Sequence, residues 1–180
     1  PLADSDIAIR FHAGDFTQVN AGINQQMVKQ VLHHLDIQSK DKVLDLFCGL
    51  GNFTLPMAQL AAQVTGVEGD EAMVQRAREN AQEFGLDNTE YHAADLTRLD
   101  PSMPWMKQHY DKILLDPPRS GALDIVQHIS AFKASTIVYV SCQPSSLVRD
   151  AQVLCEAGYR LRHLGLMDMF SLNQKAPVRV

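Results

Sequence analysis

The segment Lys42–Phe53 reads KVLDLFCGLGNF and joins an apolar run to two closely spaced glycines, Gly49 and Gly51. A run rich in Val and Leu is typical of a buried strand. Glycines directly after such a run allow a tight turn into a helix, and without a Cβ atom they let the backbone approach a ligand closely. The segment therefore predicts a strand, a turn and a helix with a binding site at the turn.

Four more β-rich runs follow this strand, with helical patterns between them. The predicted strands are Lys42–Phe47, Gln63–Glu68, Thr89–Ala94, Lys112–Asp116 and Thr136–Ser141, followed by a last apolar stretch near Tyr159–Met167. The predicted helices are Gly22–Leu35, Phe53–Ala62, Asp70–Phe84, Ala122–Phe132 and Pro144–Ala157. This alternation predicts the α/β class, with a doubly wound, mostly parallel sheet and helices on both faces in a Rossmann-like arrangement.

The chain has 180 residues, of which 46% are hydrophobic and 21% charged, as in one ordinary globular domain. We expect residues 1–20 to be a lead-in segment from a missing N-terminal part and residues 21–180 to form the main domain. No apolar stretch approaches the roughly 20 residues that span a bilayer, and the N-terminus lacks the layout of a secretory signal. The predicted location is therefore cytoplasmic, with no membrane partner.

The formal net charge of -5 argues against binding nucleic acid through a broad basic surface. Any RNA is expected to be held locally, or by parts outside this chain. The three cysteines, Cys48, Cys142 and Cys155, lie far apart in the sequence and predict neither a disulfide framework nor a metal site. No protein partner is evident.

Two acidic residues follow the next two predicted strands, at the edge of the sheet where ligands of open α/β sheets bind. Glu68 ends the second strand, where it can accept hydrogen bonds from ribose hydroxyls, and Asp95 follows the third, placed to accept from an adenine amino group. Either acid alone is typical of a surface or helix-capping residue. The dinucleotide fingerprint G-x-G-x-x-G is absent, because Thr54 stands three residues after Gly51. The pattern favours an adenosyl ligand without pyrophosphate over NAD.

The fourth and fifth predicted strands lead into residues that suit catalysis. The fourth runs into Asp116–Arg119 (DPPR), where two prolines fix the backbone. The fifth is followed by Cys142 and then by a helix, whose N-terminus would favour the reactive thiolate. Cys155, on a helix among apolar neighbours, is interpreted as a small hydrophobe, and Cys48 as a small residue inside the glycine loop.

A thiol beside an acid suits methylation of uracil. Carbon 5 of uracil is too weak a nucleophile to attack a methyl sulfonium unaided, so a thiolate must first add to carbon 6. Cys142 fits that role. Asp116, in its protonated form or through the ring N–H, would hold the base and stabilise the charge that develops. The base must leave its stack to reach these groups.

Taken in order, these motifs resemble those of the RNA uracil-5 methyltransferase family. Phe16–Asn20 matches its F-x-Q-x-N motif, Asp45–Phe53 its D-L-F-C-G-x-G-N-F loop, Asp116–Arg119 its D-P-P-R motif and Ser141–Pro144 its S-C-x-P motif. The resemblance extends from Phe11 to Phe170. Gly51–Pro56, Val67–Gly69 and Met167–Phe170 look most like the bacterial enzymes that act on 23S ribosomal RNA, rather than the transfer RNA member.

The resemblance implies a class I S-adenosylmethionine-dependent methyltransferase that acts on carbon 5 of uridine in RNA, with 23S ribosomal RNA as its partner. The implied catalytic residues are the nucleophile Cys142 and Asp116. The implied cofactor-binding residues are Gln18, Phe47, Gly49, Gly51, Asn52, Glu68, Asp95 and Asp116. The implied substrate-binding residues are Phe16, Gln18 and Arg119.

The sequence departs from the family near its C-terminus. Family members continue after D-x-F with Pro, His and a Glu that removes the carbon 5 proton, whereas here Phe170 is followed by Ser171–Lys175 and no Glu lies beyond Glu156. We therefore expect the domain to be incomplete there, and the polypeptide to bind cofactor but turn over poorly. The family's N-terminal RNA-binding barrel and iron–sulfur cysteines are also absent. An iron–sulfur cluster of the parent protein would have no ligands in this chain.

Two other functions stay open from the residues alone. An amino-group methyltransferase would also use an acid followed by two prolines, but it needs no thiol and usually presents an aromatic residue where this chain has Arg119. A cofactor-binding module without catalysis of its own is the alternative from another class, and the missing base favours it.

Overall fold

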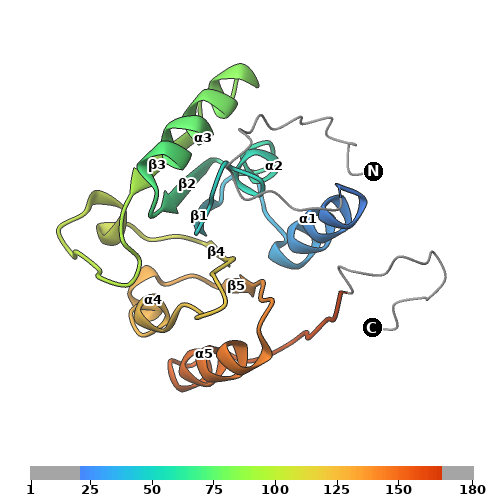
Figure 1. Cartoon of the computed structure of the whole chain (residues 1–180), viewed down its shortest axis with the longest axis vertical. Coiled ribbons are helices and arrows are strands. Elements are labelled where there is room, and N and C mark those ends of the chain that lie inside the picture. The colour runs from blue at the N-terminus through green and yellow to red at the C-terminus, as the bar shows by residue number, and fades with distance from the viewer. Residues whose placement is uncertain (1–20, 168–180) are drawn as a thin grey trace.

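The chain folds around a five-stranded parallel sheet in the computed structural model, which describes residues 21–167 (Figure 1). The strands are β1 (Lys42–Leu46), β2 (Gln63–Glu68), β3 (Thr89–Ala93), β4 (Lys112–Leu115) and β5 (Thr136–Tyr139). Their order in the sheet is β3-β2-β1-β4-β5. The order reverses beside β1, and this reversal is the topological switch point at which open α/β sheets bind ligands.

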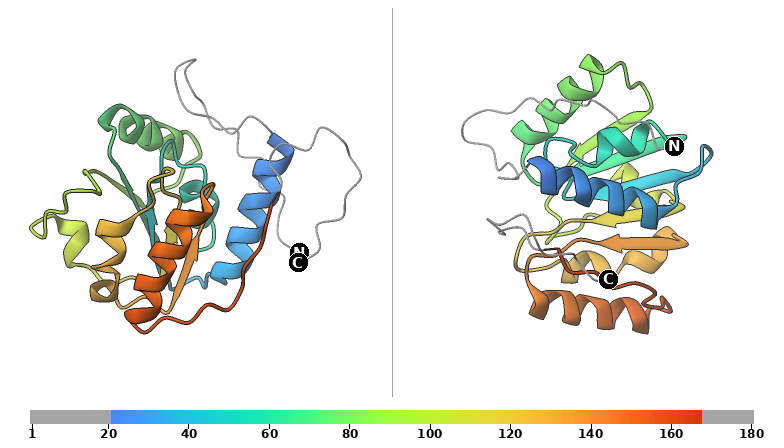
Figure 2. Two further views of the ribbon diagram at one scale, coloured as in Figure 1. Left: turned by 60° about the horizontal axis from the view of Figure 1, so that its bottom comes forward. Right: turned by 90° about the vertical axis from the view of Figure 1, so that its right-hand side faces the viewer.

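Helices cover both faces of the sheet, as the sequence predicts (Figure 2). The helices α1 (Ala21–Leu35), α2 (Thr54–Ala58) and α3 (Glu71–Glu83) pack on one face. On the other face lie α4 (Leu123–Val126), α5 (Pro144–Glu156) and the 3₁₀ turns η1 (Pro104–Lys107) and η2 (Ile129–Phe132). Among the described residues, no helix is both long and apolar enough to cross a membrane.

The central strand β1 is buried on both faces and divides the core into two layers. Leu44 and Leu46 pack against the α4 and α5 layer, whereas Val43 packs against α1 and α2. Asp45 points to the same layer as Val43, since alternate residues of a strand face the same side, and its side chain meets Thr54 of α2. Asp45 thus places a carboxyl group within an apolar strand, four residues before Gly49 of the glycine loop (Gly49–Gly51).

Three predicted elements differ from the observed ones. The helix predicted over Phe53–Ala62 ends at Ala58, and the one predicted over Ala122–Phe132 is split into α4 and η2. The 3₁₀ geometry of η2 repeats every three residues and brings Ile129 and Phe132 into the same buried cluster. The apolar stretch near Tyr159–Met167 forms no strand, and its leucines are largely exposed.

The close approach of β2 to its neighbours depends on Gly66. A Cβ atom there would lie 2.8 Å from Cδ1 of Tyr91 and 2.9 Å from Sγ of Cys48. Both neighbours are buried and cannot move freely. Position 66 therefore requires glycine, because a larger residue would clash with these two side chains.

We predict that Gly66→Ala lowers the free energy of unfolding by about 1–3 kcal/mol, because overpacking forces buried side chains from their places. Urea unfolding followed by circular dichroism measures the change. Gly69→Ala is the matched control, since a Cβ atom there meets only the Ala94 carbonyl at 3.9 Å. Equal stability of the two variants would contradict the packing argument.

Candidate active site

The turn after β1 is held rigidly at the carboxyl edge of the sheet. The peptide N–H groups of Phe47 and Cys48 both donate to the carbonyl of Val67 in β2, over 2.8 and 3.1 Å. The buried amide of Asn80 on α3 donates to the carbonyl of Leu50 at 3.1 Å. The backbone is left-handed at Phe47, with a φ of 65°. It is therefore pinned from two neighbouring elements.

The two loop glycines also have positive φ angles, 55° at Gly49 and 92° at Gly51. Residues with a Cβ atom rarely adopt these backbone angles without strain. At Gly51 a Cβ atom would in addition come within 3.3 Å of Cγ of Leu55. The backbone conformation therefore favours glycine at both positions of the loop that the sequence predicts.

Glu68 ends β2 and ties the glycine loop to the next turn. One carboxylate oxygen accepts from the N–H of Gly49 at 3.1 Å, and the other accepts from the N–H of Gly69 at 2.7 Å. The oxygen bonded to Gly69 also accepts from the N–H of Asp70 at 3.3 Å, so the oxygen bonded to Gly49 is the one that keeps a lone pair for a ligand hydroxyl. The side chain is already oriented before any ligand arrives.

Asn52 is held by a residue that the sequence interpretation missed. Its side-chain amide donates to Oδ1 of Asn24 on α1 at 3.0 Å and accepts from Nδ2 of Asn24 at 2.8 Å. This reciprocal pair fixes α1 to the loop. Nothing local in the sequence marks Asn24, because its partner lies 28 residues away.

Asp95 is exposed just past the end of β3. One of its oxygens accepts from the N–H of Thr97 at 2.9 Å and from the hydroxyl of Thr97 at 2.7 Å. These two bonds hold the pKa of the carboxyl below its usual value. Asp95 therefore stabilises its own turn as a carboxylate. It lies past the carboxyl end of β3, where the sequence predicts the cofactor site.

Asp45 belongs to the same edge, although it was not among the predicted site residues. It is fully buried, and one oxygen accepts from the hydroxyl of Thr54 at 2.5 Å. The other oxygen has no hydrogen-bond partner among the described residues. The pKa of this carboxyl is raised to about 7, chiefly by burial; the bond from Thr54 opposes this rise, and the nearby charges of Asp116 and Glu68 add to it. An incompletely satisfied buried acid is typical of a binding site.

Asp116 and Cys142 follow the two neighbouring strands β4 and β5. The N–H of Asp116 donates to the carbonyl of Leu46, and the N–H of Val140 donates to that of Leu115. These bonds extend the sheet register beyond the strand ends and place both residues at the same edge. Asp116 is half-buried, which raises the pKa of its carboxyl to about 6. The thiol of Cys142 is exposed.

The other two cysteines differ sharply from each other. Cys48 is buried, and this burial raises the pKa of its thiol well above the usual value, so it is not the reactive one. Cys155 is exposed on α5, and its interpretation as a buried hydrophobe is wrong. The buried stripe of α5 runs through Ser146, Asp150, Val153 and Leu154, and Cys155 lies one position beyond it.

Two of the remaining predicted site residues, Phe47 and Arg119, are described by the structure, and the other two are not. Phe47 is partly buried against the α4 and α5 layer, and Arg119 is exposed on the loop after β4. Phe16 and Gln18 lie outside the described residues, as do the lead-in segment and the motif that ends at Phe170. Within residues 21–167 no cluster of His, Cys, Asp and Glu could hold a metal ion.

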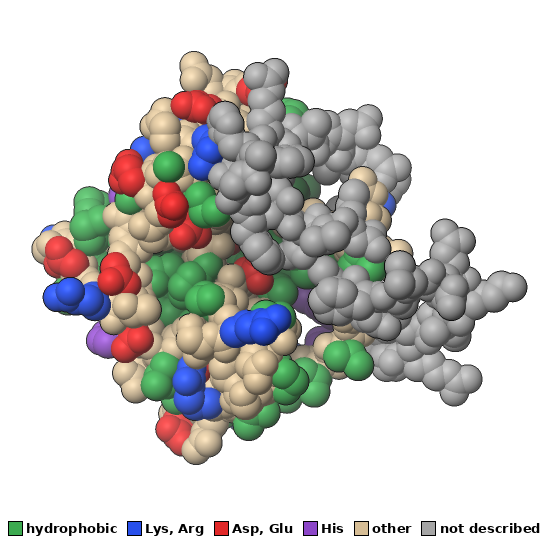
Figure 3. Space-filling model, in the orientation of Figure 1, with side chains coloured by type: hydrophobic (Ala, Val, Ile, Leu, Met, Phe, Trp, Pro, Cys, Tyr) green, Lys and Arg blue, Asp and Glu red, His purple; other side chains and the backbone are tan. Residues whose placement is uncertain are grey.

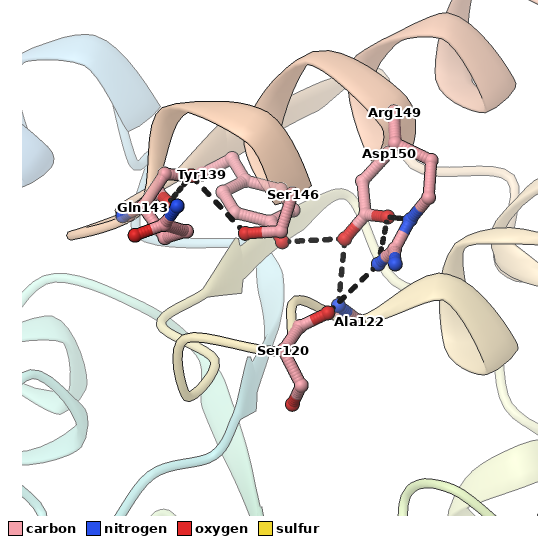
Figure 4. A network of polar contacts seen from close by, with 8 residues as sticks. Ser120, Ala122, Tyr139, Gln143, Ser146, Arg149 and Asp150 are labelled. Atoms are coloured by element: carbon pink, nitrogen blue, oxygen red, sulfur yellow. Dashed lines mark hydrogen bonds and ion pairs between the residues drawn. The ribbon is translucent and has the colours of Figure 1, made fainter.

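A buried carboxylate joins the loop after β4 to α5 (Figure 4). Asp150 is fully buried and accepts hydrogen bonds from the N–H of Ala122 and the hydroxyl of Tyr139, both at 2.6 Å. It also pairs with Arg149, which in turn donates to the carbonyl of Ser120 at 2.9 Å. This network, which the sequence interpretation missed, fixes the Asp116–Gly121 loop against the helix that begins next to Cys142.

A parallel sheet with this strand order, a glycine turn after β1 and acids at the following strand ends define a class I methyltransferase fold. Solved structures share it. A magnesium protoporphyrin IX methyltransferase from Synechocystis, solved with bound S-adenosylmethionine, has a TM-score of 0.64 over 86% of this chain and 82% of its own, at 21% identity. A transfer RNA (uracil-54, C5)-methyltransferase from Pyrococcus abyssi, solved with S-adenosyl-L-homocysteine, has a TM-score of 0.68 at 27% identity. The latter match covers 80% of this chain and 34% of that one.

The chain belongs to the tRNA (uracil-5-)-methyltransferase family, whose sequence profile matches residues 1–176. It is 54% identical over 166 residues to the 23S rRNA (uracil(1939)-C(5))-methyltransferase RlmD of Xanthomonas campestris, which covers 92% of this chain. The same identity holds over 170 residues of the protein of that name from Methylococcus capsulatus. The chain spans 37% and 38% of the lengths of these two relatives.

We predict that the stability of the protein falls as the pH rises from about 4 to about 7. The folded chain keeps the Asp45 proton up to about pH 7, whereas an unfolded carboxyl releases it near 3.8, so the folded state binds more protons in this range. The group should remove up to about 4 kcal/mol of unfolding free energy across the window. Urea titrations at stepped pH check this. Asp45→Asn should reduce the slope, leaving the part that Asp116 contributes through its own raised pKa, and the exposed control Asp124→Asn should keep it in full. Parallel curves for all three would refute the assignment.

Alkylation separates the three thiols. We expect iodoacetamide to label Cys142 and Cys155 in the folded protein and Cys48 only after unfolding, because a reagent reaches exposed thiols and the thiolate is the reactive form. Peptide mass spectrometry identifies the labelled residues. Labelling of Cys48 at the rate of the other two would be incompatible with its burial.

Proposed function

We propose that this chain binds S-adenosylmethionine at the ends of β1, β2 and β3 and methylates carbon 5 of a uridine in RNA, with 23S ribosomal RNA as the substrate. The observation that carries the proposal is the exposed thiol of Cys142, which follows β5 as Asp116 follows the neighbouring strand β4, at the sheet edge that also bears the glycine loop. The names of the relatives support the reaction and the RNA.

The residues present suit the cofactor. The glycine loop leaves room for close approach of the backbone, Glu68 presents oriented oxygens for ribose hydroxyls, and Asp95 is a carboxylate for the adenine amino group. The carboxylate of Glu68 and the nearby carboxyl of Asp116 give the site a negative character that favours a cation. S-adenosylmethionine supplies a methyl group on a positively charged sulfur.

The reaction that we propose begins at Cys142. Its sulfur forms a bond to carbon 6 of the uracil, and the electron pair of the C5–C6 double bond moves toward the carbonyl oxygen at carbon 4. Carbon 5 then attacks the methyl group, whose bond to the positively charged sulfur breaks and leaves that sulfur as a neutral thioether. A base must next take the proton from carbon 5 so that the bond between the cysteine sulfur and carbon 6 breaks and the thiolate returns. Because no Glu lies beyond Glu156, we expect this last step to be slow in this chain.

Asp116 holds the uracil in this scheme. With a pKa of about 6, its carboxyl is easily protonated, and in that form it donates a hydrogen bond to the developing oxyanion. In its ionised form it accepts from the ring N–H instead. Backbone bonds anchor its loop at both ends, to Leu46 and to Asp150, so the loop that carries the carboxyl is positioned before the substrate arrives.

We predict a covalent adduct between the protein and RNA containing 5-fluorouridine in the presence of S-adenosylmethionine. Fluorine at carbon 5 cannot leave as a proton does, so the bond to sulfur persists. Intact-protein mass spectrometry detects the added mass. Cys142→Ala should abolish the adduct, and Cys155→Ala, which removes the other exposed thiol, should leave it unchanged.

Two outcomes would count against the proposal. An adduct that survives Cys142→Ala would assign the nucleophile to another residue. The absence of any adduct with the wild-type protein, while calorimetry detects cofactor binding, would favour a cofactor-binding module without this catalysis.

A further inference from the structure

A groove opens beside the proposed nucleophile, between the loop after β4 and the start of α5. Its volume is about 490 Å³, within the range of small-ligand sites. It is lined by Arg119, Ser120, Gln143, Ser145, Ser146 and Arg149. Gln143 directly follows Cys142, so the groove begins next to the place proposed for the uracil.

The lining of the groove is cationic and rich in hydrogen-bond donors. Two guanidinium groups and three serine hydroxyls face it, and no carboxylate is among the lining residues. The nearest acid, Asp150, is 0% exposed and is already engaged by Ala122, Tyr139 and Arg149. Arg119 is exposed and makes no ion pair within residues 21–167. Asp150 balances the charge of Arg149, so the uncompensated positive charge of the groove is that of Arg119.

Arg149 is oriented in advance. Its guanidinium pairs with Asp150 at 2.7 Å and donates to the carbonyl of Ser120 at 2.9 Å, yet its side chain stays 44% exposed (Figure 4). A side chain fixed before binding loses less entropy when a ligand arrives. On the face drawn in Figure 3, the coloured Lys and Arg side chains occur in small groups among acidic ones, without a broad basic surface.

We propose that this groove binds a phosphodiester of the RNA strand immediately next to the methylated uridine, with Arg119 and Arg149 as its charged contacts. The inference rests on the proposed function, because it places the phosphate beside the base that reacts at Cys142. A phosphate offers three features that the groove matches: negative charge, several acceptor oxygens and a shape that guanidinium groups bind with two parallel hydrogen bonds. It also explains how an acidic domain holds RNA locally.

The first test measures RNA binding by fluorescence anisotropy at several salt concentrations, using a short single-stranded RNA with one uridine. Arg119→Gln should weaken binding by roughly tenfold, the scale of one charge-assisted contact. The plot of log affinity against log salt should become shallower by about 0.7, the value for one phosphate of a single strand. Arg160→Gln is the matched control: Arg160 is exposed beyond the C-terminal end of α5, does not line the groove and should change neither quantity.

A second test identifies the phosphate. Methylphosphonates, which lack the negative charge, replace one phosphate at a time within two nucleotides of the uridine. One replacement should weaken binding to the wild-type protein at least as much as Arg119→Gln does. Its effect should be smaller in that variant, where only the contact with Arg149 is left to lose. Fully additive losses at every position would overturn the site.

The 5-fluorouridine adduct, measured on the same preparations, separates the two proposals. If the wild-type protein forms the adduct but Arg119→Gln leaves affinity and salt dependence unchanged, the phosphate site is wrong and the function stands. If the salt dependence changes as expected but no adduct forms, the groove binds phosphate and the proposed chemistry is wrong.

Discussion

The carbonyl of Val67 is the single acceptor on which the active-site edge depends. It receives the N–H groups of both Phe47 and Cys48, and so converts the end of β1 into a turn at one fixed place. The two strands can approach this closely only because Gly66 precedes Val67 and leaves room for Cys48 and Tyr91. The glycine loop, the orientation of Glu68 and the position of α2 all follow from that contact. A backbone constraint, rather than a side chain, thus sets the geometry of the cofactor half.

Much of this arrangement could be predicted from sequence, because short apolar runs indicate buried parallel strands and the carboxyl ends of such strands meet at one edge of the sheet. The five strands, the helices on both faces and the family were predicted in this way, and the structure and relatives agree. The misses have a common cause in long-range contacts. Asn24 and Asp150 look like ordinary polar residues of helices, and their roles appear only when Asn52 and Ala122 are brought beside them. The exposure of Cys155 likewise depends on which stripe of α5 meets the sheet.

The electrostatics of the edge differ between its two halves. Asp45 and Glu68 lie near each other on β1 and β2. Burial raises the pKa of Asp45, and the charge of Glu68 adds to this rise. Among the described residues beyond β4, the fully buried Asp150 accepts from four donor groups and pairs with Arg149, whereas Arg119 is exposed and forms no ion pair there. A positively charged sulfur and a negatively charged RNA strand would thus each meet the opposite charge, in a domain whose overall charge is negative.

The strand order also bears on how the chain folds. The sheet joins β1 to β4 across a long separation in sequence, as the bond from the N–H of Lys42 to the carboxylate of Asp111, 69 residues away, illustrates. Contacts between β1, β2 and β3 close shorter loops and are therefore expected to form earlier, since the entropy of loop closure grows with loop length. The glycine loop can then be in place while Asp116 and Cys142 are still apart from it. Bringing together the two halves of the site is in this sense a late folding event, and a chain arrested before β4 docks would have half of the site without its thiol.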